Sequence, residues 1–220
     1  MLSSNTQLLS YNLASGGATT DANLVTPFAP TVLSFVDQVN LFNATLASKP
    51  SYAPWTAADT LFGVWIGVND VGNAWYKAEW PTLSVQIIDQ YFNQVQRLYN
   101  LGARKFVFLN VPPINRAPSN LGSDEWSQTT LKAAIQTYNN LIVARTALFN
   151  AANAGAQAQA IDIFTKFDLV LDNPTVYGAA NSSCWNADGK TCLWWNDYHP
   201  GLVLQNGVAD DVAVLTGLYL

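Results

Sequence analysis

The chain has 220 residues, half of them hydrophobic and only 11% charged, with ten basic and fifteen acidic side chains and a net charge of −5. Because the basic residues are few and scattered, neither nucleic acid nor an anionic membrane is expected as a partner. No apolar run approaches the length of a membrane span, so we expect residues 1–220 to form one soluble domain with a well-filled core, as a monomer.

Short apolar runs alternate with longer stretches of helical periodicity, which is typical of βαβ units around a mainly parallel sheet. In chain order, the pattern predicts strands at residues 9–14, 60–68, 105–111 and 158–164. It predicts helices at residues 32–42, 82–101, 131–149 and 202–220. We therefore expect an α/β fold with a small doubly wound sheet. Ligands bind outside the carboxyl ends of the strands in such sheets, so the candidate site comprises the segments that follow them: 15–21, 67–73, 110–116 and 194–201.

Two cysteines, Cys184 and Cys192, lie in a loop rich in small polar residues. One histidine and two cysteines at this spacing do not make a zinc set, so no metal and no cofactor are expected. A local disulfide is the better interpretation, and it would stabilise the fold by roughly 2–3 kcal/mol. The pair, together with sequons at Asn43 and Asn181, favours an extracellular glycoprotein. Residues 1–11 nevertheless lack the pattern of a signal peptide.

Three features in the loops after predicted strands are candidates for chemistry. Gly17 follows the first predicted strand, where it either makes a tight turn or offers a backbone N–H to an oxyanion. Asn69 follows the second predicted strand, where its side chain either caps a turn or donates to an oxyanion. His199 is the only histidine of the chain, and it is either structural or a general base.

Taken together, "YNLASGGATTD", "GVWIGVNDVGNAW" and "WNDYHP" resemble the GDSL/SGNH hydrolase family, and most of all its fungal-type extracellular acetylesterase and lipase-like branch. The resemblance implies a flavodoxin-like three-layer α/β/α fold and a serine that attacks an ester carbonyl. It implies that Gly17 and Asn69 form the oxyanion hole and that His199 is the general base. Acetylated carbohydrates or other short-chain esters would be the substrates.

The chain departs from this family at the nucleophile. The family carries it in a Gly-Asp-Ser motif after a first, central strand, and that motif occurs nowhere in these 220 residues. No other serine, Ser15 included, stands in the right place. We therefore expect an N-terminally truncated domain without its first strand and without esterase activity on its own. A Gly-Asp-Ser segment in the reading frame upstream of Met1 would decide for the enzyme.

The acid that orients the histidine also departs from the family. The family usually has aspartate three residues before the histidine, but this chain has Asn196 there and a carboxylate one position later at Asp197. Three possibilities stay open: Asn196 orients His199, Asp197 reaches His199 through a shifted turn, or activity is weak.

The remaining candidates are two tryptophans, each with two possible roles, and three aspartates, for which we expect a structural role. Trp194 and Trp195 either belong to the core or line an acyl or sugar subsite, and we carry them as candidate substrate-lining residues. Asp162 is expected to form hydrogen bonds at a strand end, and Asp21 and Asp70 are expected in turns or caps. The competing hypotheses for the whole chain are a non-catalytic carbohydrate-binding or structural descendant of the family, and an unrelated flavodoxin-like binding protein.

Overall fold

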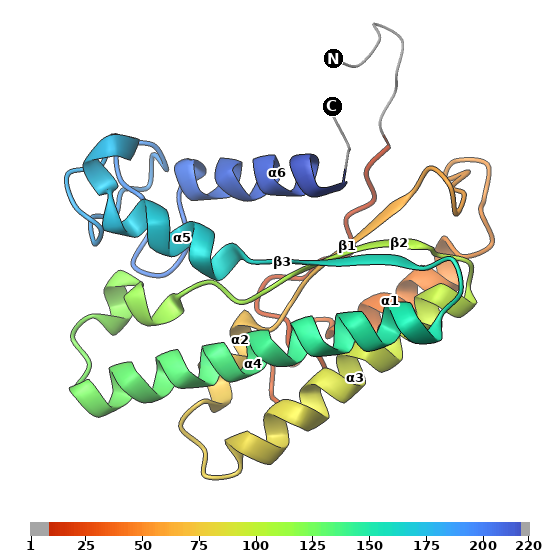
Figure 1. Cartoon of the computed structure of the whole chain (residues 1–220), viewed down its shortest axis with the longest axis horizontal. Coiled ribbons are helices and arrows are strands. Elements are labelled where there is room, and N and C mark those ends of the chain that lie inside the picture. The colour runs from red at the N-terminus through yellow and green to blue at the C-terminus, as the bar shows by residue number, and fades with distance from the viewer. Residues whose placement is uncertain (1–8, 217–220) are drawn as a thin grey trace, which may run out of the picture.

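The structure, a computed structural model, describes residues 9–216, and in this part of the chain a parallel sheet lies between two layers of helices (Figure 1). The strands are β1 (Leu61–Trp65), β2 (Lys105–Leu109) and β3 (Gln157–Ile161), in the order β1-β2-β3. The helices of the described residues are α1 (Phe35–Thr45), α2 (Val68–Ala74), α3 (Trp80–Asn100), α4 (Glu125–Ala152), α5 (Ile163–Asp172) and α6 (Leu202–Thr216). Three 3₁₀ turns complete them: η1 (Ile114–Arg116), η2 (Pro118–Asn120) and η3 (Pro174–Tyr177).

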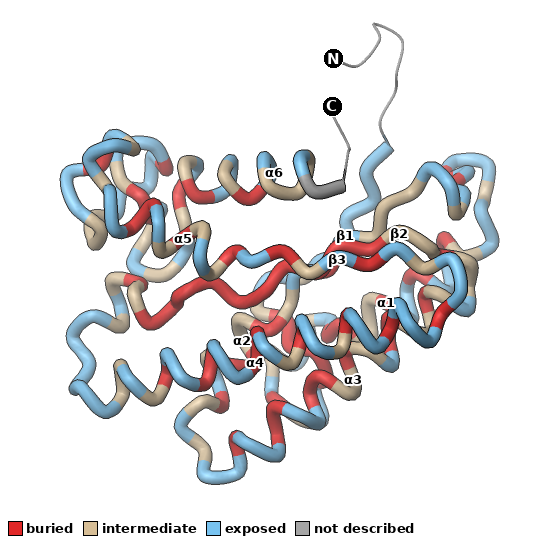
Figure 2. The backbone as a smooth tube through the Cα atoms, in the orientation of Figure 1, coloured by how far each residue is buried: buried red, intermediate tan, exposed pale blue. Residues whose placement is uncertain are grey.

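The two faces of the sheet carry alternate side chains of each strand, and each face meets its own helices. Val64, Phe106, Phe108 and Ala158 belong to the large core shared with α1, α3 and α4. Val107, Leu109 and Ile161 belong to the second core, with α5 and α6. Figure 2 shows the buried stretches of β2 and β3 between these layers. The predicted α/β/α architecture is therefore confirmed.

Polar groups next to two of the helices define where they begin. Ser34 precedes α1, accepts a hydrogen bond from the Asp37 N–H through its hydroxyl, and donates its own N–H to the Asp37 carboxylate. This capping box explains why α1 begins three residues after the start of the predicted helix. Asp124 caps α4 in a similar way, by accepting from the N–H of Ser127 at 2.7 Å.

The strand predicted at residues 9–14 is wrong, because this segment is irregular in the structure. Leu9 and Tyr11 are 50% and 43% exposed, so alternation of apolar residues does not correspond to a buried face here. The Ala14 N–H donates to the side chain of Asn12 rather than to a neighbouring strand. The pattern of a strand is insufficient when no partner strand lies alongside it.

Strand β1 has a partner on one side only, since it pairs with β2 and ends the sheet of the described residues. Gly63 and Trp65 are exposed, and they point to the same face as Val107 of β2, which is buried. The layer formed by α5 and α6 therefore covers β2 and β3 but leaves part of β1 open.

Two further predictions, the last helix and the lack of a membrane span, can be compared with the structure only within residues 9–216. The last predicted helix is present as α6, but residues 217–220 of the prediction lie outside the described part. Among the helices between residues 9 and 216, none is both long enough and apolar enough to cross a lipid bilayer.

Candidate active site

The glycine at position 17 is required by the shape of its loop. Its φ of +79° lies in the left-handed region, and a Cβ added there would stand 2.4 Å from the Cβ of Phe28. The Gly17 carbonyl accepts from the Phe28 N–H at 3.0 Å. Within residues 9–216 the Gly17 N–H donates no hydrogen bond, so it is available to a ligand. Phe28, 86% exposed, was not noticed in the sequence, because nothing there links it to Gly17.

Two consecutive side chains at the start of α2 fasten this loop. The amide nitrogen of Asn69 donates to the Ala18 carbonyl at 2.9 Å. The carboxylate of Asp70 accepts from the Thr20 N–H at 3.0 and 3.1 Å and from the Thr20 hydroxyl at 3.2 Å. The loop after Gly17 and the helix that carries Asn69 therefore form one unit.

Asp70 is more than the cap residue that the sequence predicts, because it is completely buried. Burial raises its pKa to about 7, although the hydrogen bonds from Thr20 act in the opposite direction. Asp21, which is also buried at 7% exposed, lies in a turn as predicted, and its carboxylate accepts from the Asn23 N–H at 2.9 Å. No pattern of neighbouring residues reveals that these two aspartates are buried, since burial depends on elements far away in the sequence.

Gly67 lies directly before α2 and begins the sequence Gly-Val-Asn-Asp at residues 67–70, and its backbone shows why glycine is needed there. Its φ is +115°, and a Cβ there would lie 2.5 Å from the ring of Tyr138 in α4. A larger residue would therefore push α2 away from α4 and displace Asn69.

The ring of His199 is next to Asn196. Nδ1 of His199 lies 3.2 Å from Oδ1 of Asn196, and the same oxygen accepts the N–H groups of Tyr198 at 2.9 Å and His199 at 2.6 Å. The two backbone donors fix this end of the amide as the oxygen. Because an amide oxygen can only accept, Nδ1 must carry the ring proton, and Nε2 of the neutral ring keeps a lone pair.

Asp197 is not brought to the histidine. Its backbone carbonyl accepts from the Ser119 N–H at 2.8 Å, and its exposed side chain forms no hydrogen bond or ion pair with His199 in the described part of the chain. Of the two candidates for orienting His199, the geometry thus favours Asn196.

The histidine loop is held from both sides. Cys184 and Cys192 form the predicted disulfide, with 5.4 Å between their Cα atoms. On the other side, the Tyr198 hydroxyl lies 3.2 Å from where a Cβ of Gly72 would be. Gly72 is in α2, so the loop that carries His199 packs against the helix that carries Asn69. Tyr198 and Gly72 were not predicted, because their contact joins segments that are 126 residues apart.

The two candidate tryptophans differ in their surroundings. Trp194 is only 2% exposed, belongs to the second core and donates its indole N–H to the Ser182 carbonyl at 2.8 Å. A ring enclosed in this way cannot line an open site, so the core interpretation is correct and the substrate-lining assignment of Trp194 is wrong. Trp195 is 47% exposed, and its ring centre is 6.4 Å from that of His199.

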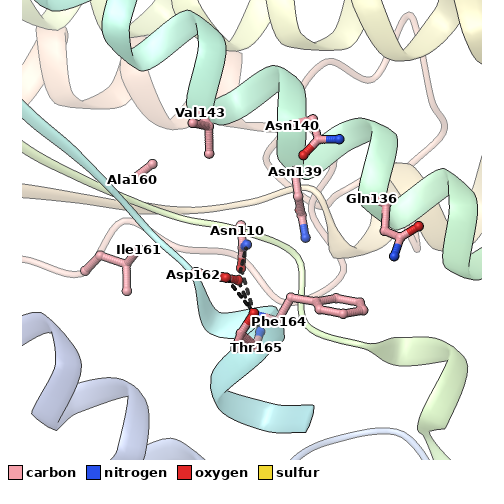
Figure 3. A pocket seen from close by; sticks show the side chains of 10 residues that line it. All are labelled: Asn110, Gln136, Asn139, Asn140, Val143, Ala160, Ile161, Asp162, Phe164 and Thr165. Atoms are coloured by element: carbon pink, nitrogen blue, oxygen red, sulfur yellow. Dashed lines mark hydrogen bonds between the residues drawn. The ribbon is translucent and has the colours of Figure 1, made fainter. Parts of the chain in front are cut away.

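A separate cavity of about 300 Å³ lies between α4 and α5 at the carboxyl ends of β2 and β3 (Figure 3). Asp162 is at its edge and accepts from the Asn110 side chain at 2.9 Å and from the Thr165 N–H at 3.1 Å. The prediction that Asp162 forms hydrogen bonds at a strand end is confirmed. In residues 9–216, no three His, Cys, Asp or Glu side chains are arranged to hold a metal ion.

Comparison with known proteins adds independent findings. Residues 2–210 match the family model described as GDSL-like lipase/acylhydrolase. The chain is 50% identical over 206 residues to an acetylesterase of Thermothelomyces thermophilus, an alignment that covers 93% of this chain and 68% of that protein. It is 26% and 24% identical to two GDSL esterase/lipases of Arabidopsis thaliana, covering 80% and 79% of this chain. The chain spans 59% and 57% of those two plant proteins.

Proposed function

Because the chain belongs to the GDSL-like lipase/acylhydrolase family, a family of ester-hydrolysing enzymes, we propose that it supplies the oxyanion hole and the general base of a serine carboxylic-ester hydrolase. The observation that carries this proposal is the contact between His199 Nδ1 and Asn196 Oδ1. That contact leaves Nε2 unprotonated, in a loop packed against the helix of Asn69.

Each group has a defined task in the proposed reaction. Nε2 of His199 takes the proton of a serine hydroxyl while the serine oxygen attacks the carbonyl carbon of the ester. The carbonyl oxygen of the ester then becomes an oxyanion. The Gly17 N–H and the second N–H of the Asn69 amide donate to that oxyanion. One N–H of the Asn69 amide donates to the Ala18 carbonyl, and this hydrogen bond fixes the direction of the other N–H. His199 then returns the proton to the leaving alcohol, and water releases the acyl group by the same steps in reverse.

For the substrate, we propose acetyl or other short-chain esters, with an acetylated carbohydrate as the alcohol part. The name of the relative from Thermothelomyces thermophilus, an acetylesterase, supports the acetyl group. The half-exposed ring of Trp195 beside His199 supports a substrate with a surface on which an aromatic ring can pack. An extracellular location is part of the proposal and agrees with the disulfide and with the exposed sequon asparagines Asn43 and Asn181.

The hydrolysis of p-nitrophenyl acetate tests the proposal in two forms of the protein. Since the Gly-Asp-Ser motif is not among the 220 residues, we expect this chain alone to show no turnover above that of the His199→Ala variant. A form extended upstream to include the motif should be active. In that form, Asn69→Ala should lower kcat by about 10²–10³, the loss expected for one oxyanion donor.

Three outcomes would contradict parts of the proposal. Turnover by the 220-residue chain that His199→Ala abolishes would show that a nucleophile is present after all. An unchanged kcat in Asn69→Ala would remove Asn69 from the oxyanion hole. An extended and folded form without activity would favour the non-catalytic descendant, for which the asparagine at position 196 is the specific observation.

A further inference from the structure

Two aromatic side chains at the surface, Tyr76 and Trp126, each lie beside Trp75, the residue directly after α2. The ring centres of Trp75 and Trp126 are 5.8 Å apart, and those of Trp75 and Tyr76 are 5.7 Å apart. Tyr76 is 58% exposed and Trp126 is 63% exposed, whereas Trp75 packs partly against the large core. We call these three residues the aromatic platform. Its central ring is anchored in the fold, while the outer two present their surfaces to solvent.

The platform has free polar groups as well as apolar faces. Trp55, Trp194 and Trp195 each use their indole N–H in a hydrogen bond to a backbone carbonyl. In residues 9–216, the indole N–H groups of Trp75 and Trp126 and the Tyr76 hydroxyl have no such partner. A ligand with an apolar face and a polar rim could therefore use both parts of each ring.

The charged residues nearby narrow the class of ligand. In the sequence next to the platform there is one cation, Lys77, and three anions, Glu79, Asp124 and Glu125. An anionic membrane or a nucleic acid would need an excess of basic side chains here. A neutral sugar chain needs none, and each of its rings combines C–H faces with hydroxyl groups.

The platform lies at the C-terminal end of the helix that carries Asn69. Trp75, the residue directly after α2, follows Asn69 by six positions, so the two are about 9 Å apart along the helix axis and on different sides of it. Between them, Gly72 contacts Tyr198, the neighbour of His199. In the described fold, α2 packs against α4, which carries Trp126 near its start (Figure 1). The platform and the loop that carries His199 therefore adjoin the same short helix.

We propose that Trp75, Tyr76 and Trp126 form a binding site for a neutral oligosaccharide, which holds the carbohydrate part of the substrate while its ester is at His199. This inference rests on the proposed function for its role in catalysis, but the binding itself requires no catalysis. Tyr76 and Trp126 would stack on sugar rings, and the free N–H and O–H groups would bind sugar hydroxyls.

Isothermal titration of the 220-residue chain with cellohexaose and xylohexaose tests the proposal. We expect saturable binding of at least one of them. Trp126→Ala and Tyr76→Ala should each weaken that binding about three- to tenfold, as for the loss of one ring contact. Tyr52→Ala is the matched control, since Tyr52 is equally exposed at 65% but lies after α1, and it should bind like the unmodified chain.

The outcomes separate this inference from the esterase proposal. No binding of either sugar, or affinities unchanged in both platform variants, would overturn the inference even if the extended form is an active esterase. Tighter binding to phosphatidylcholine vesicles than to sugars would overturn it in favour of a lipid surface. Sugar binding by the 220-residue chain that depends on the platform, together with an extended form that has no esterase activity, would support the inference and contradict only the proposed function.

Discussion

Asn196 stands where the resemblance to the GDSL hydrolases leads one to expect aspartate, and its amide oxygen accepts the main-chain N–H groups of Tyr198 and His199. An asparagine could in principle turn its NH₂ group toward the histidine and favour the wrong tautomer. The two main-chain donors prevent this, because a rotated amide would set N–H groups against N–H groups. Asparagine in place of aspartate at position 196 thus removes a negative charge but keeps an oxygen that accepts from Nδ1 of His199.

This argument at the residue scale predicts the tautomer of His199. In a long-range ¹⁵N–¹H NMR spectrum, the single histidine should show its proton on Nδ1 at a pH where the ring is neutral. Asn196→Ala removes the acceptor, so the ring should lose this preference. Asp197→Ala is the control and should leave the tautomer of the ring as it was, since the Asp197 side chain forms no hydrogen bond or ion pair with the ring in the described structure. A tautomer that changes with Asp197 and not with Asn196 would reverse the assignment.

At the scale of elements, the site depends on the loop of residues 15–21 and on α2, which Asn69 and Asp70 hold together. Two adjacent glycines in this loop have different surroundings. A Cβ at Gly17 would collide with Phe28 at a backbone conformation with positive φ, whereas a Cβ at Gly16 would have nothing within 4 Å.

Alanine substitutions at the two glycines should therefore have different effects. Gly17→Ala should lower the free energy of unfolding in urea by about 1–3 kcal/mol, because the left-handed backbone and the contact with Phe28 both oppose a side chain. Gly16→Ala should change it by less than about 0.5 kcal/mol. Equal effects of the two substitutions would show that the shape of the loop does not require Gly17.

The helices and strands also show which parts of the fold could be predicted from the sequence. β1, β2 and β3 were predictable as short apolar runs, and α3 and α4 from their helical periodicity. The boundaries were less predictable, because α4 begins six residues before its predicted start and β3 ends three residues before its predicted end. The segment 9–14 was not predictable, because alternation does not say whether a partner strand is present. His199, Asn69 and Gly17 could be selected by motif, but the choice between Asn196 and Asp197, like the enclosure of Trp194, depends on the path of a loop that no local pattern specifies.

At the scale of the whole molecule, Asp70 links the stability of the fold to pH. Its pKa is raised to about 7 in the folded chain, chiefly by burial, above an ordinary value of 3.8. Between these values the folded state binds more protons than the unfolded state, so the free energy of unfolding must fall as pH rises. The contribution is complete below pH 4 and is lost as pH rises through 7.

The Asp70→Asn variant should isolate this contribution. Urea denaturation at pH 5 and pH 8 should show the unmodified chain losing stability with a slope of up to about 1.4 kcal/mol per pH unit from this group. The variant should lose less over the same interval, because an amide does not ionise. Parallel pH profiles for the two proteins would mean that the Asp70 carboxyl titrates in its ordinary range despite its burial.

Within residues 9–216, one side of β1 has no partner strand, and this has a consequence of its own. The main-chain N–H and C=O groups along the outer edge of a strand can pair with any extended segment that approaches them, whether it comes from the same polypeptide or from another copy. On the exposed face of β1, Gly63 has no side chain to hinder an approaching segment, and Trp65 offers that segment an apolar surface. Association between copies through this edge is thus a route to aggregation for the described part of the chain.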